Sequence, residues 1–321
     1  MIDLTVSLVT GNNKKFILDC LRSIYETNNS LKMEVYVVIN ASSDDSEEAI
    51  RKDFPEVKFI VNKKKLGFTH NHNIVMERSK GKYVLVLNDD TIMLDATLKK
   101  MVDFMETSPD VGILGCKILN ADGSLQWSCG KSFSHKFEHF KSGMLNQFLP
   151  FLSKQSFKGT EEVSWVTGAC LLARSKALER VGLFDENITI YYEDGDLCYR
   201  MIQAGWKVVF YPEAEIIHYH GQTRKQHLGR DTFITYQSRL YFFAKHHSRS
   251  MYHLIRVLTV LEVTARYIKT WLCYSRGKKT QRQELLGAYK QVVRLVLSPQ
   301  HSRKTTDKEV PEEKRRRQLN C

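Results

Sequence analysis

The chain has 321 residues, of which 42% are hydrophobic and 26% charged, and its formal net charge is +12. This length and composition allow one large domain, or one domain with an appendage, and exclude a largely disordered or fibrous chain. The charge is uneven, since residues 246–321 hold 17 Lys and Arg against 6 Asp and Glu (+11), whereas residues 1–245 carry only +1. A segment this basic indicates an anionic partner: nucleic acid, a membrane surface or a phosphorylated substrate.

The first hundred residues alternate patterns that are typical of strands and helices. Strand-like apolar runs cover residues 4–9, 35–39, 57–61 and 83–87, and helical spacing covers 16–24, 47–54, 71–78 and 95–106, the last with Asp95 as its cap. Such repeats predict an α/β fold with a mostly parallel, Rossmann-like central sheet flanked by helices. Ligands bind such sheets at the carboxyl ends of the strands, and the polar clusters at 10–13, 40–45 and 88–90 fall at those ends.

The second half of the chain has fewer regular patterns. We expect strands at 111–115, 166–172 and 206–211, the last ending before Pro212, and a helix over 196–204. Residues 120–165 have loop-like composition and little periodicity.

The cluster at residues 88–90 follows a fully apolar strand. Carboxylates in that place suit Mg²⁺ or Mn²⁺, which bind oxygen ligands and often share them with substrate phosphates. The alternative is that Asp89 or Asp90 only caps a turn.

Two further clusters carry titratable side chains. Glu193 and Asp194 lie between aromatic residues and the next helix, where partial burial would raise a carboxyl pKa towards that of a useful base. Asp196 reads instead as the N-cap of that helix. His218 and His220 can both reach one site if the chain is kinked there, but face opposite sides of a regular strand.

Taken in order, these segments resemble the motifs of family 2 glycosyltransferases, which are inverting enzymes of the GT-A fold. The matching segments are LVTGN at 8–12, VVINASSD at 37–44, the Asn-rich LGF segment at 62–73, LNDDT at 87–91, DGSLQ at 122–126, TGAC at 167–170, VGLFDE at 181–186 and YEDGDLCYR at 192–200. They run from about residue 4 to residue 246. The pattern is most similar to bacterial rhamnosyltransferase-like members that build surface polysaccharides.

The resemblance implies a role for each cluster. It assigns Asp194, with Glu193 beside it, to the general base, and Asn88 and Asp90 to a divalent cation, Mg²⁺ or Mn²⁺, with His218 or His220 adding to that site. The residues implied in nucleotide-sugar binding are Thr10, Asn12, Asn40, Asp44, Gly67, Asn73 and Asp89, and those on the acceptor side are Trp165, Gly168 and Ala169. The implied reaction transfers a sugar from a dTDP- or UDP-sugar, with dTDP-rhamnose as one candidate, to a lipid-linked or polysaccharide acceptor.

Three residues depart from the family pattern. Ile39 stands where many members have an Asp that binds the nucleoside, Asp89 replaces the usual Pro, and His70 replaces a small residue. A degenerate, inactive domain that tethers a complex to membrane or nucleic acid is therefore the alternative function. A dehydrogenase and a P-loop enzyme are excluded because their glycine-rich motifs are missing.

The basic segment has two amphipathic patterns, at residues 251–272 and 285–296. In the first, polar residues lie opposite a broad apolar arc: Arg256, Thr259, Glu262, Arg266, Lys269 and Thr270. Basic helices of this kind predict binding to an anionic membrane surface through residues 251–297, and the alternative is that they pack on the body of the protein. No nucleic-acid-binding motif accompanies the charge.

These patterns predict three regions: a glycosyltransferase domain at 1–245, a basic helical region at 246–310 and a charged, disordered tail at 311–321. The N-terminal residues read as a strand rather than a signal peptide, and the seven scattered cysteines suit a reducing compartment. We therefore expect a cytoplasmic protein that is peripheral at the inner face of the cell membrane.

Overall fold

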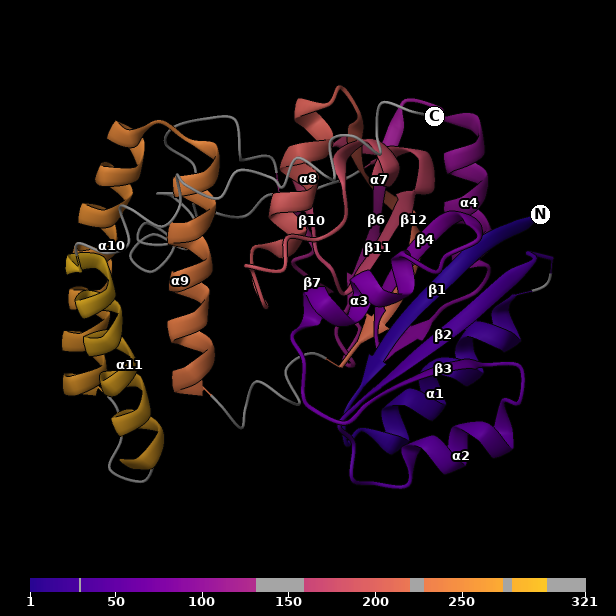
Figure 1. The fold of residues 1–321 in the computed structure, drawn as a ribbon, viewed down its shortest axis with the longest axis horizontal. Coiled ribbons are helices and arrows are strands. Elements are labelled where there is room, and N and C mark those ends of the chain that lie inside the picture. The colour runs from indigo at the N-terminus through magenta and orange to yellow at the C-terminus, as the bar shows by residue number, and fades with distance from the viewer. Residues whose placement is uncertain (29, 131–158, 220–227, 274–278, 299–321) are drawn as a thin grey trace. The chain divides into compact units, whose positions relative to one another are not determined.

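The computed structural model describes residues 1–28, 30–130, 159–219, 228–273 and 279–298 (Figure 1). Its contacts divide the chain into two compact units, Met1–Gln222 and Thr223–Cys321. The expected tail at 311–321 and His220 lie outside the described residues.

The first unit is built on one mixed, mostly parallel sheet with strand order β3-β2-β1-β4-β11-β6-β12-β5. Its strands are β1 (Ile2–Thr10), β2 (Met33–Asn40), β3 (Lys58–Asn62), β4 (Gly81–Asn88), β5 (Thr91–Met93), β6 (Val111–Leu119), β11 (Cys170–Arg174) and β12 (Lys207–His218), with β7 (Leu125–Gln126) and β9 (Glu161–Glu162) at its margins. A separate two-stranded sheet pairs β8 (Cys129–Gly130) with β10 (Trp165–Val166). Strands β11 and β5 run antiparallel to their neighbours.

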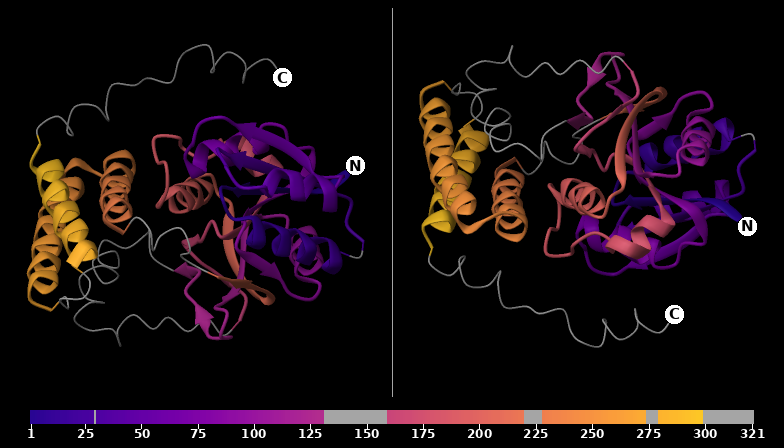
Figure 2. Two further views of the ribbon diagram at one scale, coloured as in Figure 1. Left: turned by 90° about the horizontal axis from the view of Figure 1, so that it is seen from below. Right: turned by 90° about the horizontal axis from the view of Figure 1, so that it is seen from above.

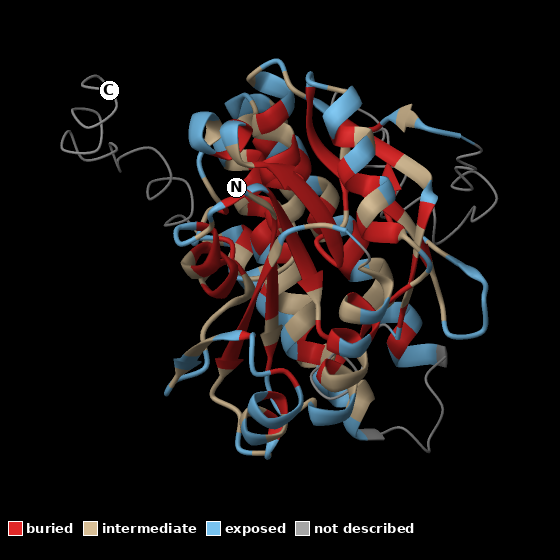
Figure 3. Ribbon diagram, turned by 90° about the vertical axis from the view of Figure 1, so that its right-hand side faces the viewer, coloured by how far each residue is buried: buried red, intermediate tan, exposed pale blue. Residues whose placement is uncertain are grey.

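Helices cover both faces of the sheet. They are α1 (Lys14–Thr27), α2 (Ser46–Asp53), α3 (Phe68–Met76), α4 (Thr97–Thr107), α7 (Ser175–Val181) and α8 (Glu193–Gln203). Alternate residues of β4 point to opposite faces, so Leu85 and Leu87 join the core under α1 and α4, whereas Val84 and Val86 join the core under α7 and α8. Figure 3 shows the buried strands lying between more exposed helices. This is the expected α/β architecture.

Three local expectations were wrong. Strand β12 continues through Pro212, because a shift in register between Tyr211 and Glu215 accommodates a residue that cannot donate to the ladder. The apolar run at 166–172 divides into β10 and β11 around a turn at 167–169. Helix α4 begins after a left-handed Ala96 with no side-chain cap, so Asp95 does not cap it.

The second unit contains α9 (Leu228–His246), α10 (Arg249–Cys273) and α11 (Lys279–Leu297), which Figure 2 shows in two further views. The first of these helices contacts both of the others, so the unit boundary lies before α9, whereas the sequence analysis drew it at residue 245. In the part of the chain that the structure describes, no helix is long and apolar enough to cross a membrane.

Helix α10 places its polar side inside this unit. Glu262 is only 6% exposed, and its carboxylate accepts hydrogen bonds from Tyr236 (3.0 Å), Arg239 (2.8 Å) and Arg266 (3.0 Å). Large apolar side chains of the same helix are exposed instead: Leu254, Val257, Leu261, Ile268, Trp271 and Leu272. The buried side chains of α10 therefore include the polar Glu262, whose charge is satisfied by ion pairs with Arg239 and Arg266.

Candidate active site

The polar clusters gather at one edge of the sheet. Because β1, β2 and β4 are parallel neighbours, their carboxyl ends lie side by side, with Thr10 paired to Ile39 and Val9 to Asn88. Strand β11 starts at this same edge, since it is antiparallel to β4. Residues far apart in the chain thus meet where ligands bind α/β sheets.

Asn12 joins the loops that follow β1 and β2. Its side-chain oxygen accepts hydrogen bonds from the Ser42 hydroxyl (3.1 Å) and from the backbone N–H groups of Ser43 (2.7 Å) and Asp44 (3.2 Å). Its backbone is left-handed, with φ of 60°, a conformation that asparagine tolerates better than most residues. The structure therefore gives Asn12 a direct role in shaping the predicted nucleotide loops.

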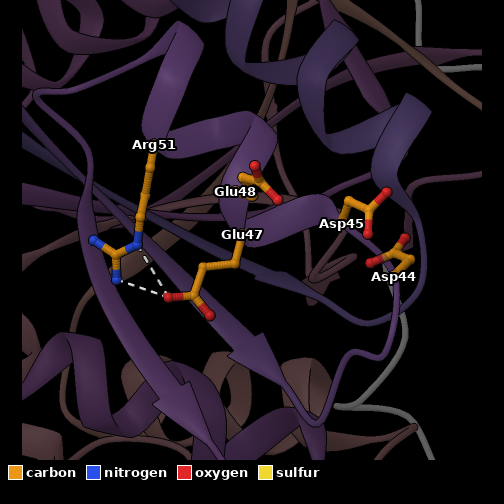
Figure 4. Close-up of a pocket in the computed structure, with 5 residues that line it drawn as sticks. All are labelled: Asp44, Asp45, Glu47, Glu48 and Arg51. Carbon is orange, nitrogen blue, oxygen red and sulfur yellow. Dashed lines mark hydrogen bonds and ion pairs between the residues drawn. The ribbon is translucent and has the colours of Figure 1, made fainter.

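Asp44 is held by hydrogen bonds at the start of α2. Partial burial alone would raise its pKa, but donors on Ser46, Ser42 and the Lys14 backbone outweigh burial and lower the pKa. Asp44 lines a hollow together with Asp45, Glu47, Glu48 and Arg51 (Figure 4). Four carboxylates around one Arg would repel a diphosphate, so this hollow is unsuited to the phosphate end of a donor.

Asn40, Gly67 and Asn73 all contact protein backbone. Asn40 exchanges two hydrogen bonds with Leu66, at 3.1 and 2.9 Å. A Cβ on Gly67 would lie 3.1 Å from the Thr189 carbonyl oxygen, so the close approach at this glycine is to the protein itself. Asn73 likewise exchanges two hydrogen bonds with Phe184, at 2.9 and 3.0 Å.

The neighbouring acids Asp89 and Asp90 point to different sides of the site. Asp89 accepts a 3.1 Å hydrogen bond from Asn13, and its burial raises its pKa to about 7. The Thr10 hydroxyl is close enough to Asp89 to lower its pKa in part. Among the described residues, however, this hydroxyl makes no hydrogen bond. Asp90 lies instead 3.1 Å from the Nε2 atom of His218.

His218 sits between the β4 end and the DGSLQ hairpin. Its Nε2 lies 3.2 Å from the Asn88 side-chain nitrogen, and its Nδ1 lies 2.7 Å from the Gln126 side-chain oxygen. In the described ranges, no group of three or more His, Cys, Asp and Glu is placed to hold a metal ion. Asp90 supplies the kind of oxygen ligand that Mg²⁺ and Mn²⁺ take together with diphosphate oxygens, and the His218 imidazole beside it can add a nitrogen ligand.

Glu193 and Asp194 open helix α8, after two tyrosines with left-handed backbones, Tyr191 (φ 63°) and Tyr192 (φ 71°). Conformations of this kind are strained and cluster at functional sites. The Glu193 Oε2 atom is buried without a hydrogen-bond partner among the described residues. Burial, followed by the nearby Asp194 charge, raises the Glu193 pKa well above its ordinary value. Burial thus disfavours the charged form of Glu193.

Asp194 is intermediate in exposure, whereas Glu193 is buried. Its two oxygens accept hydrogen bonds from the backbone N–H groups of Gly168 (3.0 Å) and Gly195 (2.7 Å). Burial raises its pKa, and these donors oppose the rise. A carboxylate held in this way can accept a proton from a hydroxyl group.

The turn at 167–169 connects Asp194 to Asn88, the last residue of β4. Gly168 donates to Asp194, and the carbonyl oxygen of the next residue, Ala169, accepts a 3.0 Å hydrogen bond from the Asn88 backbone. A Cβ on Gly168 would lie 3.2 Å from the Phe68 ring, so this turn is tightly enclosed. Trp165 lies just before the turn, with its ring 5.0 Å from that of Trp127 and nearly perpendicular to it.

The prediction of Asp196 as the N-cap of its helix was wrong, and the sequence pattern gave Arg200 no role. Helix α8 begins at Glu193, so Asp196 lies within its first turn, is fully buried and accepts a 2.8 Å hydrogen bond from Arg200. Arg200 also donates to the carbonyl oxygens of Val181 (2.8 Å) and Leu183 (2.7 Å). The i, i+4 spacing of an acid and an arginine was the available signal.

Comparison with known proteins identifies the family of this chain. The family model described as glycosyltransferase like family 2 matches residues 3–232. The chain belongs to this glycosyltransferase family. The N-acetylglucosaminyl-diphospho-decaprenol L-rhamnosyltransferase of Mycobacterium tuberculosis is 26% identical over 234 residues, which cover 67% of this glycosyltransferase and 76% of that protein. Rhamnosyltransferase WbbL of Escherichia coli is 30% identical over 160 residues, or 48% of this chain and 61% of that protein.

Solved structures show that the glycosyltransferase has the GT-A fold. The mannosyltransferase PcManGT of Pyrobaculum calidifontis, in complex with GDP-Man and Mn²⁺, matches with a TM-score of 0.55 at 17% identity, covering 94% of this chain and 83% of that one. TarS 1–349 of S. aureus, in complex with UDP-GlcNAc, matches with a TM-score of 0.56 at 15% identity, covering 91% and 82%. The recognition of the family and of its fold from sequence motifs is thereby confirmed.

Proposed function

We propose that this glycosyltransferase transfers a sugar from a nucleotide diphosphate donor, with inversion, to a lipid-linked or polysaccharide acceptor in cell-surface glycan synthesis. Relatives named as rhamnosyltransferases make dTDP-rhamnose the first donor to test. One observation supports the proposal most strongly: the 167–169 turn bonds to Asp194 on one side and to Asn88 on the other. These contacts support a site in which the base and the diphosphate-binding edge lie together.

Asp194 acts as the general base in this proposal. Its carboxylate accepts the proton of the acceptor hydroxyl as that oxygen attacks the anomeric carbon, and the nucleoside diphosphate leaves from the opposite face of the sugar. Glu193 is buried and its pKa is raised well above its ordinary value, which makes it the weaker candidate for that role. The Gly168 and Gly195 N–H groups keep the Asp194 carboxylate oriented towards the acceptor.

A divalent cation, Mg²⁺ or Mn²⁺, would be held by Asp90 and His218, with Asn88 beside them. When bound, it would neutralise the charge that develops on the leaving diphosphate. A solved relative of this fold that contains Mn²⁺ supports this part of the proposal. Asp89, which bonds to Asn13, would contribute to the nucleotide side instead.

The helical unit would bind an anionic membrane surface at the cytoplasmic face, near a lipid-linked acceptor. Helices α9, α10 and α11 together contain 11 Lys and Arg but only three Asp and Glu. The exposed apolar side chains of α10 include Leu261 and Trp271. Basic charge combined with exposed Leu and Trp is the composition of interfacial helices.

Replacement of the base tests the proposed reaction. A calorimetric panel of UDP-, dTDP- and GDP-sugars first identifies the donor, and Asp194→Asn should then bind it with unchanged affinity while kcat falls by about 10²–10⁴-fold. Asp103→Asn, which removes an exposed carboxylate on α4, is the matched control and should behave as the wild type. Full activity of Asp194→Asn would exclude Asp194 as the base, and a wild-type chain that binds no nucleotide sugar would exclude the whole function.

A further inference from the structure

The DGSLQ segment forms a hairpin between β6 and β7 whose side chains bond to one another. Gly123 turns the chain with φ of 78°, a left-handed conformation that favours glycine. Gln126, at the end of this hairpin, reaches His218 on β12. The proposed function uses His218 but assigns nothing to the hairpin.

Four hydrogen bonds run in series from a carboxylate to the imidazole. Ser124 donates to Asp122 (2.5 Å), Asn120 donates to Ser124 (2.9 Å), Gln126 donates to Asn120 (2.9 Å), and the Gln126 oxygen then faces Nδ1 of His218 (2.7 Å). A carboxylate can only accept, so the Ser124 hydroxyl must donate to Asp122 and accept from Asn120. Each amide along the series is thereby fixed in one orientation.

The end of the series determines which ring nitrogen of His218 carries the proton. The Gln126 oxygen can only accept, so Nδ1 must donate and Nε2 is left with its lone pair. The Asn88 side-chain nitrogen, 3.2 Å from Nε2, can only donate and requires the same tautomer. Two contacts on opposite sides of the ring therefore agree.

The Nε2 lone pair accepts one donor at a time, so a cation bound to Nε2 and to the Asp90 carboxylate, 3.1 Å away, would take the place of the Asn88 N–H group. Histidine ligands of metals commonly have the second ring nitrogen fixed by an outer hydrogen bond in this way.

We propose that the series Asp122–Ser124–Asn120–Gln126 holds His218 in its Nδ1–H tautomer and so presents Nε2, together with Asp90, to a divalent cation. Gln126 is then a positioning residue, which acts through His218. That the bound species is a divalent cation rests on the proposed function. The tautomer of His218 does not, because it can be measured in the metal-free protein.

The first experiment is NMR of the full chain labelled with ¹⁵N-histidine, in which long-range ¹H–¹⁵N correlations distinguish the two tautomers and the doubly protonated ring. Comparison with His218→Gln assigns the signal. We expect an Nδ1–H ring in the wild type and in Leu125→Ala, a control in the same hairpin. We expect loss of that single tautomer in Gln126→Leu and in Asn120→Ala, where the Gln126 amide is free to reverse. A wild-type ring that is protonated at Nε2, or at both nitrogens, would overturn the proposal.

The second experiment measures Mn²⁺ binding in the presence of UDP, from the electron paramagnetic resonance signal of free Mn²⁺. Gln126→Leu should weaken Mn²⁺ affinity about 10–100-fold, whereas Gln126→Glu, which keeps an acceptor for Nδ1, should recover most of it. Equal affinity in Gln126→Leu and the wild type would refute the positioning role. If the wild type shows the expected tautomer but binds no Mn²⁺, the fixed tautomer stands and the proposed metal fails.

Discussion

The ion pair between Asp196 and Arg200 gives a sharp test of how this fold is stabilised. Arg200→Met keeps much of the length of the side chain but removes every hydrogen bond that its guanidinium makes. The Asp196 carboxylate is fully buried and would lose its 2.8 Å partner, and the carbonyl oxygens of Val181 and Leu183 would lose their donors. Removal of one member of a buried pair costs about 3–5 kcal/mol.

This loss should be visible in urea denaturation of the full chain. With a slope of about 3 kcal/mol per molar urea for a unit of this size, the transition of the first unit should shift down by about 1–1.7 M. Intrinsic fluorescence reports mainly that unit, because it holds three of the four tryptophans: Trp127, Trp165 and Trp206.

A matched control separates burial from charge. Arg22→Met removes an arginine that pairs with Asp19 at 3.0 Å on an exposed helix surface, and such pairs contribute less than about 1 kcal/mol. Arg200→Lys keeps the charge but cannot reach both carbonyl oxygens, so its midpoint should fall between those of the wild type and Arg200→Met. If Arg200→Met shifts the midpoint no further than Arg22→Met, the buried pair does not hold the 181–183 loop.

Two further predictions concern pH and membranes. Burial lowers the pKa of His72 to about 3, against about 6.5 in the unfolded chain, so the unfolded state binds the extra proton and stability should decrease as pH falls below 6.5. The loss in the free energy of unfolding should reach about 2 kcal/mol at pH 5. Urea titrations between pH 7 and pH 5 should show a smaller change in this free energy for His72→Gln than for the wild type. Equal changes in the two proteins would contradict the assignment to His72. The double variant Leu261→Glu/Trp271→Glu should bind phosphatidylglycerol vesicles at least about tenfold more weakly in flotation assays, since each buried apolar side chain contributes about 1.5–3 kcal/mol. The control variant Gln283→Glu/Gln291→Glu adds the same charge at exposed positions of α11 and should bind vesicles nearly as well as the wild type. An equal loss of vesicle binding in both variants would show that only charge matters.

The sheet could be predicted from sequence because its strands are buried on both faces. Residues 83–87 are uninterrupted apolar residues, a pattern that suits few other environments. Strand β12 was cut short because Pro212 ordinarily ends a strand, and only the pairing with β6 shows the bulge that admits it. Periodicity reports which side chains are buried, whereas bulges depend on neighbouring strands.

The site was predicted as a set of clusters, but not as a set of contacts. The motifs placed Asp194 and Asn88 at strand or helix ends, and a parallel sheet brings such ends together. Nothing in the spacing shows that Asp89 and Asp90 point apart, towards Asn13 and His218. That depends on β1, which neighbours β4, and on β12, which pairs with β5 just after Asp90. Long-range side-chain pairing is a property of the topology.

Helix α10 shows why an amphipathic pattern does not by itself say which face is inside. The pattern separates a polar side from an apolar side, and the usual inference that the apolar side is buried assumes that charges have no partners within the protein. Here Glu262 meets Arg239 from α9 and Arg266 from its own helix, so the cost of burying its charge is offset by two ion pairs. Once the polar side is satisfied within the unit, Leu261 and Trp271 are left exposed. A surface that is apolar within and anionic outside would stabilise exposed apolar side chains beside many basic residues, and this argument supports the proposed binding to a lipid bilayer rather than to a nucleic acid.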